Sequence, residues 1–302
     1  MIEVSWYNLI TEYGVFLKLE KSLSENTIDA YINDVKKLAN FLEMTGNPAN
    51  PEEIKLSDLE LFLEWVNKLG MSPRTQARVV SGIRGFYKFL LLEDVIQQDP
   101  TALLESPKIG RKLPDVLSVN EIDRLLASID LSKPEGQRNK AMLETLYSCG
   151  LRVSELINLK ISNIYKELGF VKIVGKGNKE RLVPISPKAL KEIDLYFQDR
   201  RKISHIERDS ENILFLNRRG KKLSRIMIFT IIKDLARKIN LKKNISPHTF
   251  RHSFATHLID GGADLRAVQE MLGHESIITT EIYTHLDREY LRDTIIQFHP
   301  RS

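Results

Sequence analysis

The first part of the chain repeats apolar residues with the period of an α-helix. Ile28, Val35 and Leu42 fall on one side of a predicted helix that follows a short polar stretch. Ser57 and Glu60 fit the pattern of a capping box, which predicts the start of a second helix. We therefore expect an N-terminal part built from amphipathic helices.

A further helix is predicted to begin at Ser72-Pro73, because proline is favoured in the first helical turn. Opposite its apolar side, basic residues surround two small ones, and the set comprises Arg74, Arg78, Lys88, Ser81 and Gly85. Small residues let a backbone approach a groove, so the three basic side chains are predicted to bind DNA. The alternative is an ordinary solvated helix face.

The helical pattern lapses beyond residue 92, where prolines and basic residues gather. We expect a linker at 107–116, which separates a helical DNA-binding domain at 1–106 from a second domain at 117–302. Ser118 and Glu121 form a second capping-box pattern at the start of that domain.

The second domain mixes two periodicities. Helical periods cover 118–130 and 137–160, and helices dominate again after residue 187. Two β-prone segments, 170–174 and 181–184, flank the turn sequence GKGNKE and predict a β-hairpin, while 213–216 predicts a further short strand. The expected fold class is mainly α with a small β-sheet in this domain, an α+β arrangement.

Composition narrows the partners. With 42% hydrophobic residues among 302, the chain has enough apolar residues for two cores. Lys and Arg number 45 against 40 Asp and Glu, and the pI near 9.1 favours a polyanionic partner. The single cysteine, Cys149, fits a reducing compartment. Neither a membrane-spanning run nor a secretory signal is found, so we expect a cytoplasmic protein without membrane contact.

The densest polar stretch surrounds His248 and Arg251, which lie three residues apart and share a face if Pro247 begins a helix. His274 and Tyr283 follow in the next elements. Arginines and histidines without an organised carboxylate cluster suit a phosphate better than Mg²⁺. The pattern predicts phosphoryl transfer that needs neither metal nor cofactor, with tyrosine as the nucleophile.

Four short motifs, in this order, resemble the tyrosine recombinase (phage integrase) family, and within it the bacterial Xer chromosome-dimer resolvases. They are the Arg152 motif CGLRVSEL, the Lys176 turn GKGNKE, the box HTFRH from His248, and LGH followed by YTH, which contain His274 and Tyr283. Each motif is short, but their combination is specific, and the resemblance covers nearly the whole chain.

The resemblance implies that Tyr283 attacks the scissile phosphate and leaves a 3′-phosphotyrosine and a free 5′-hydroxyl. It implies that Arg152 and Arg251 bind the phosphate oxygens and that Lys176 protonates the leaving 5′-oxygen. His248 would exchange the tyrosine proton.

Two further roles are implied around the phosphate. His274 would donate to a phosphate oxygen, and Glu155 would orient the neighbouring groups. Taken one at a time, these residues also fit structural roles, such as an ion pair between Arg152 and Glu155, so the prediction rests on the whole set.

The same resemblance implies a C-shaped clamp that closes on a double-stranded recombination site. Four protomers, identical or including a paralogous recombinase, would act together, and a cell-division DNA translocase is a candidate activator. The apolar tail residues Leu291, Ile295, Ile296 and Phe298 suit a groove on a neighbouring subunit, and packing within the same chain is the alternative.

Three other functions are compatible with these residues. A mobile-element integrase, from a transposon, phage or integron, uses the same set, and a type IB topoisomerase shares the chemistry. A catalytically silent DNA-binding protein belongs to a different class, and the complete residue set argues against it.

Overall fold

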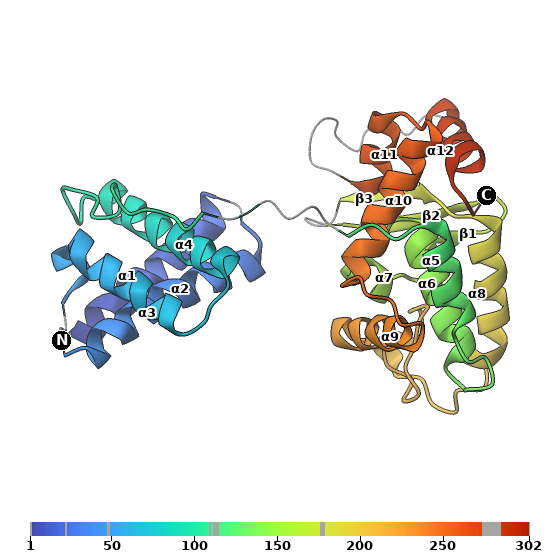
Figure 1. Ribbon diagram of the computed structural model, residues 1–302, viewed down its shortest axis with the longest axis horizontal. Coiled ribbons are helices and arrows are strands. Elements are labelled where there is room, and N and C mark those ends of the chain that lie inside the picture. Colours follow the sequence, from blue (N-terminus) through green and yellow to red (C-terminus); the bar gives the residue numbers. More distant parts are fainter. Residues whose placement is uncertain are drawn as a thin grey trace. The chain divides into compact units, whose positions relative to one another are not determined.

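In the computed structural model, the described residues are 2–21, 23–46, 49–108, 110, 115–175, 179–273 and 285–301. The chain divides into two compact units, Met1–Lys112 and Leu113–Ser302 (Figure 1). None of the helices in these ranges combines the length and the apolar character needed to cross a bilayer.

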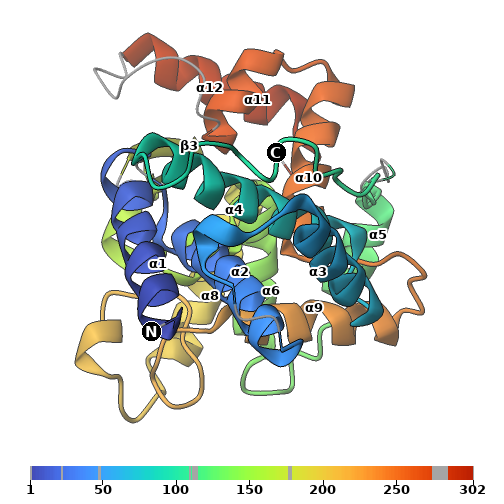
Figure 2. The same cartoon turned by 90° about the vertical axis from the view of Figure 1, so that its left-hand side faces the viewer.

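The N-terminal unit is helical, as predicted. Its helices are α1 (Ile2–Leu19), α2 (Glu25–Met44), α3 (Leu56–Lys68) and α4 (Pro73–Leu92), and they can be followed in Figure 2. Ser72 caps α4 through its hydroxyl, which accepts from the Thr75 main-chain N–H at 3.2 Å. Trp6 and Phe86 stack with ring centroids 5.8 Å apart inside the core.

One sequence expectation in this unit is wrong, and a second residue has a structural reason that the sequence did not reveal. The Ser57–Glu60 capping box does not form, because α3 begins at Leu56 and the Lys55 main-chain N–H donates to Asp58 Oδ2 at 2.9 Å. Gly85 is small for a packing reason, since a Cβ at this position would collide with the hydroxyl of Tyr13.

The C-terminal unit places helices around a small sheet, so the prediction of a mainly α fold with a small β-sheet is confirmed. Its helices are α5 (Val119–Ala127), α6 (Gly136–Ser148), α7 (Val153–Ile157), α8 (Pro187–Arg200), α9 (Arg225–Lys238), α10 (Pro247–Gly261), α11 (Leu265–Leu272) and α12 (His285–Phe298). Ser118 forms its predicted capping box with Glu121, whose carboxylate accepts from the Ser118 main-chain N–H at 2.7 Å.

The sheet is antiparallel with the order β1-β2-β3. The predicted hairpin is formed by β2 (Phe170–Val174) and β3 (Glu180–Pro184), with Ile173 opposite Arg181. The sequence did not predict β1 (Ile164–Tyr165), which is only two residues long. It predicted a strand at 213–216 that is not present, since those residues form only isolated bridges.

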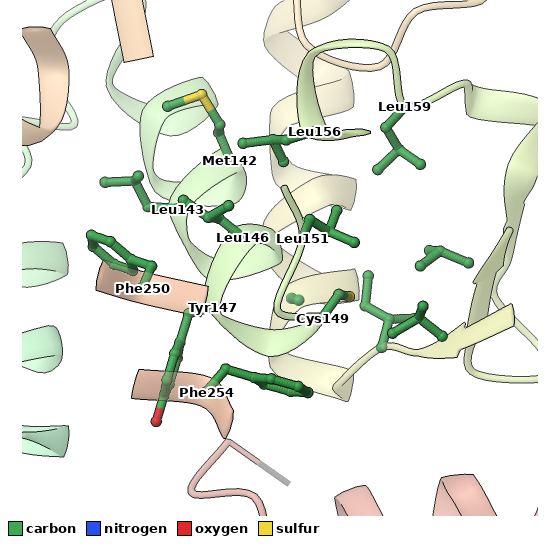
Figure 3. Packing of buried hydrophobic residues seen from close by; sticks show 14 of the residues in the cluster. Met142, Leu143, Leu146, Tyr147, Cys149, Leu151, Leu156, Leu159, Phe250 and Phe254 are labelled. Carbon is green, nitrogen blue, oxygen red and sulfur yellow. The ribbon is translucent and has the colours of Figure 1, made fainter. Parts of the chain in front are cut away.

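The helical period predicted over 137–160 is broken between α6 and α7. Gly150 takes a left-handed φ of +57°, and a Cβ there would collide with the ring of Phe254. Leu143, Leu146 and Phe250 pack in the same core (Figure 3). This turn places Arg152 at the start of α7, directly beside the core.

Helix α12 packs within its own unit. Leu291 and Ile295 belong to the same core as α6 and α10, whereas Ile296 is 49% exposed. Of the four tail residues predicted for a neighbouring subunit, Leu291 and Ile295 are therefore covered within this chain, and Phe298 packs against the same core.

Candidate active site

Arg152 is the N-cap residue of α7 and is held by the first turn of that helix. Its main-chain N–H donates to Glu155 Oε2 at 2.8 Å, and its Nη1 donates to Glu155 Oε1 at 2.9 Å. Its Nη2 donates to the carbonyl oxygen of Gly273 at 3.0 Å. The side chain remains 37% exposed, so the guanidinium is fixed in direction and still reaches the surface.

Arg251 lies on α10, which begins with Pro247 in its first turn as predicted. Nη1 of Arg251 donates to the Gly150 carbonyl at 2.8 Å, and Nη2 donates to the Leu272 carbonyl at 2.6 Å. Burial lowers the pKa of Arg251 to about 10, with the positive charge of Arg152 adding to the effect. The guanidinium still carries its charge at neutral pH.

Glu155 lies between arginines. Burial acts to raise the pKa of its carboxyl, but the hydrogen bonds and charge of Arg181, together with those of Arg152, hold that pKa below its usual range. The carboxylate is therefore ionised, and its side chain is only 3% exposed. The ion pair between Arg152 and Glu155 expected from their spacing is present, and Glu155 forms a second ion pair with Arg181.

Arg181 is the member that sequence reasoning missed. From β3, its Nη1 and Nη2 donate to Glu155 Oε1 and Oε2 at 2.8 and 2.9 Å, and its Nε donates to the Met271 carbonyl at 2.8 Å. One signal was available, because Arg181 lies two positions before the apolar Val183 and so shares the inward face of the strand with it.

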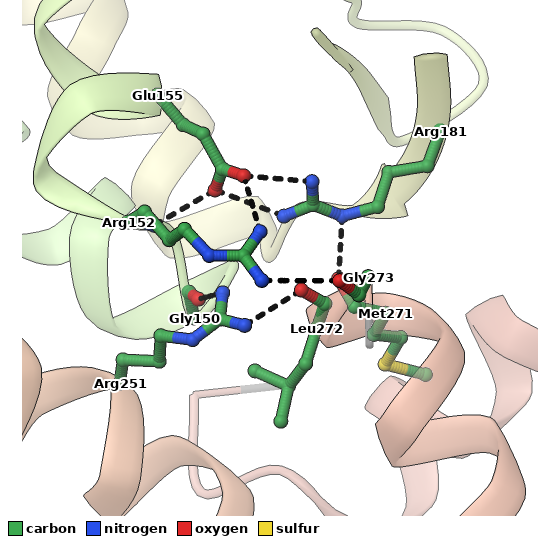
Figure 4. A network of polar contacts seen from close by, with 8 residues as sticks. All are labelled: Gly150, Arg152, Glu155, Arg181, Arg251, Met271, Leu272 and Gly273. Atoms are coloured by element: carbon green, nitrogen blue, oxygen red, sulfur yellow. Dashed lines mark hydrogen bonds and ion pairs between the residues drawn. The ribbon is translucent and has the colours of Figure 1, made fainter. Parts of the chain in front are cut away.

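The network ends on the last turn of α11 and the residue after it. Three consecutive carbonyl oxygens accept from three different arginines, namely Met271 from Arg181, Leu272 from Arg251, and Gly273 from Arg152 (Figure 4). Gly273 adopts a left-handed φ of +66°, which ends the helix. Charge-assisted hydrogen bonds are stronger than neutral ones, so this backbone position is closely fixed relative to the arginines.

A hollow of about 610 Å³ opens beside Arg251. His248 and His252 are exposed on its wall, and Asp115 and Gln269 contribute to the same lining. The structure thus brings Arg152, Arg251 and Glu155 into one network and places His248 at the adjoining surface.

Three predicted site residues, Lys176, His274 and Tyr283, lie outside the described residues. On either side of Lys176 the described residues are Gly175 and Lys179, and the Gly175 main-chain N–H donates to the Lys179 carbonyl at 2.8 Å. Gly273, the described residue that follows the last turn of α11, directly precedes His274 in the sequence.

The predicted DNA-binding residues differ in their surroundings. Arg74 and Lys88 are exposed on α4. Arg78 instead forms an ion pair with Asp34, whose side chain is fully buried, and donates to the Ala30 carbonyl at 3.2 Å. Arg78 therefore has a structural partner that its helical position alone did not reveal.

Within the described ranges, no group of three or more His, Cys, Asp or Glu side chains lies close enough together to hold a metal ion. Metal independence of the reaction stays a prediction.

Comparison with known proteins places this fold and site in a family. Residues 115–289 match the phage integrase family, and residues 10–94 match the phage integrase N-terminal SAM-like domain. The chain belongs to the phage integrase family, as its motifs predicted.

Curated relatives define its place within that family. The chain is 46% identical over 294 residues to the tyrosine recombinase XerD of Staphylococcus saprophyticus, covering 97% of this chain and 99% of the relative. It is also 46% identical over 297 residues to XerD of Staphylococcus aureus, with the same coverage. The predicted resemblance to Xer-type tyrosine recombinases is confirmed.

Solved structures share the fold. One is the XerH site-specific recombinase bound to a difH substrate, with a TM-score of 0.69, 23% identity, and coverage of 90% of this chain and 91% of that one. Another is the Tn1549 transposon integrase with circular intermediate DNA, with a TM-score of 0.70, 21% identity, and coverage of 89% and 92%.

Proposed function

We propose that the chain cuts and rejoins DNA at specific sites through a covalent phosphotyrosine. The observation that carries this proposal is the convergence of Arg152 and Arg251 on adjacent carbonyls of Leu272 and Gly273, just before the segment that contains Tyr283. Two fixed cations in this position suit the non-bridging oxygens of a phosphodiester.

In the proposed step, Tyr283 Oη bonds to phosphorus while the bond from phosphorus to the 5′-oxygen breaks. The tyrosine proton passes to His248, and Lys176 gives a proton to the departing 5′-oxygen. His274 donates to a phosphate oxygen. The products are a 3′-phosphotyrosine and a 5′-hydroxyl.

Resealing is the reverse step with a 5′-hydroxyl from another duplex. Because the phosphotyrosine bond keeps about the energy of the phosphodiester, no ATP is consumed. The substrate is a double-stranded recombination site, as the difH substrate is for the XerH recombinase. Arg74 and Lys88, exposed on α4, supply phosphate contacts from the N-terminal unit.

We assign the chain a role in resolving chromosome dimers at cell division, in the cytoplasm. The support is its 46% identity to XerD recombinases across 97% of its length. The active assembly is a tetramer made with itself or with a paralogous recombinase, and a cell-division DNA translocase is its candidate activator.

The test begins with duplexes selected from a random-sequence pool for binding to the purified protein. Each selected duplex is nicked at successive positions, so that cleavage next to a nick releases a short fragment and traps the covalent product. Denaturing electrophoresis of wild type should show a protein–DNA adduct, and Tyr283→Phe should show none. EDTA should leave the adduct unchanged.

Several results would contradict the proposal. An adduct that persists in Tyr283→Phe would remove the nucleophile assignment, and strong inhibition by EDTA would indicate a metal-dependent mechanism. Binding with no adduct at any nick position would favour a silent DNA-binding protein. Relaxation of supercoiled DNA without exchange between two sites would indicate a topoisomerase.

A further inference from the structure

Arg181 is buried beside the proposed phosphate-binding arginines, and no sequence motif gave it a role. We propose that Arg181 is a positioning residue that directs the Arg152 guanidinium toward the scissile phosphate by sharing the carboxylate of Glu155. This inference rests on the proposed function, since it concerns the same site.

Arg181 does not face the substrate. Its side chain is 8% exposed, and its three donor nitrogens all donate within the protein, to Glu155 and to the Met271 carbonyl. Any effect of Arg181 on the reaction must therefore pass through the residues that it holds.

Each carboxylate oxygen of Glu155 accepts one hydrogen bond from Arg152 and one from Arg181. Oε1 accepts from Arg152 Nη1 at 2.9 Å and from Arg181 Nη1 at 2.8 Å. Oε2 accepts from the Arg152 main-chain N–H at 2.8 Å and from Arg181 Nη2 at 2.9 Å. Arg152 thus gives Glu155 only one of its guanidinium nitrogens, and its Nη2 is directed to Gly273 instead.

Removal of Arg181 would leave the carboxylate of Glu155 without half of these hydrogen bonds. Glu155 would remain buried with Arg152 as its main cation, and a paired carboxylate and guanidinium favour a two-pronged contact. Arg152 would then turn both terminal nitrogens toward Glu155, and its charge would be withdrawn from the phosphate.

The close fit around Arg181 supports a role in alignment. A Cβ at Gly273 would lie 3.1 Å from Arg181 Cδ and 3.2 Å from its Cζ. Arg181 also follows Lys176 by five positions along the hairpin. One side chain therefore joins the hairpin, the start of α7 and the end of α11.

The test compares two substrates for each variant. Both are the selected nicked duplex, one with the ordinary scissile phosphate and one with a methylphosphonate, in which a methyl group replaces a charged oxygen. A neutral methylphosphonate depends less on a correctly placed Arg152. We expect Arg181→Met to slow adduct formation on phosphate at least about tenfold. The ratio of the methylphosphonate rate to the phosphate rate should rise by a similar factor.

The matched control is Arg218→Met. Arg218 also makes a two-pronged ion pair, with Glu135, but its side chain is 68% exposed and lies outside the network. Its rates on both substrates should equal those of wild type. Equal slowing of Arg181→Met on both substrates, or no slowing on phosphate, would overturn the positioning role.

Arg181→Lys keeps the proposal testable if Arg181→Met does not fold, as judged by circular dichroism. A lysine keeps the charge but cannot reproduce three planar donors, so the same rise in rate ratio is expected, smaller in size. A wild-type ratio in this folded variant would overturn the proposal. Absence of adduct in wild type and Arg218→Met would instead contradict the proposed function.

Discussion

Arg301 Nε lies 3.1 Å from Glu144 Oε1, and the two side chains are only 4% and 0% exposed. Arg301 also pairs with Asp123 at 2.5 Å and lies over the Tyr147 ring, 5.7 Å from its centroid. Burial nevertheless raises the pKa of Glu144, because the charge of Arg301 offsets only part of the desolvation. The residues after α12 are thus attached to α6 through a carboxyl that the fold favours in its neutral form.

The first prediction concerns pH and Glu144→Gln. Since the folded pKa exceeds the unfolded value of 4.5, the contribution of Glu144 to stability is present below pH 4.5 and is lost as pH rises through the folded pKa. Glutamine does not titrate. Wild type should therefore lose more unfolding free energy than Glu144→Gln between pH 4.5 and neutrality, as measured by urea denaturation. Parallel losses would contradict the raised pKa.

The second prediction concerns Gly150→Ala. Alanine would strain a φ of +57° and collide with Phe254, so we expect a loss of about 2 to 5 kcal/mol in unfolding free energy. Gly169→Ala is the matched control, because Gly169 has a φ of +71° and a Cβ there would come no closer than 4.0 Å to the Ile185 carbonyl oxygen. Its loss should be about 1 to 2 kcal/mol, from backbone strain alone. Equal losses would remove the role of Phe254.

The third prediction concerns Arg251→Lys. Arg251 reaches the Gly150 and Leu272 carbonyls with two different nitrogens, which a single ammonium group cannot do together. Adduct formation should fall by about a hundredfold or more. Gel-shift affinity for the selected duplex should change much less, because many phosphate contacts share the binding energy. A proportionate loss of binding would assign Arg251 to DNA affinity instead.

The fourth prediction separates the basic residues of α4. Arg78→Ala removes a partner of the buried Asp34, although Lys37 remains 3.0 Å from it, so unfolding free energy should fall by about 2 kcal/mol. Arg74→Ala and Lys88→Ala should leave stability within about 0.5 kcal/mol of wild type. Each should instead make the fall of log affinity with log salt concentration less steep, by about 0.9 in slope. Unchanged slopes would remove both residues from the DNA interface.

The sequence predicts what depends on neighbouring residues. The cap at Ser118 and the pairing of Arg152 with Glu155 each span three positions, so the pattern along the chain contains them. Tertiary partners are different, because Arg181 meets Glu155 across 26 positions and Met271 across 90. An arginine in a strand can face solvent or the interior, and only the fold decides which.

The N-terminal unit shows the same limit in its helices. Periodicity places Arg78 on a basic helix face, yet Asp34, which lies 44 positions earlier, takes up its guanidinium. The small size of Gly85 suggested close approach of the helix backbone to a DNA groove, but the hydroxyl of Tyr13 lies where a Cβ would be. Periodicity assigns a side of a helix, whereas the occupant of that side depends on which helix packs there.

The three carbonyls at the end of α11 determine which sequence changes this site tolerates, substitutions or changes in length. Met271, Leu272 and Gly273 bind their arginines through main-chain oxygens, so replacing the Met271 or Leu272 side chain leaves the hydrogen-bonding atoms in place. Inserting or deleting one residue before Gly273 would offer each arginine a different carbonyl. The number of residues up to the end of α11 is therefore constrained more tightly than side-chain identity at these two positions.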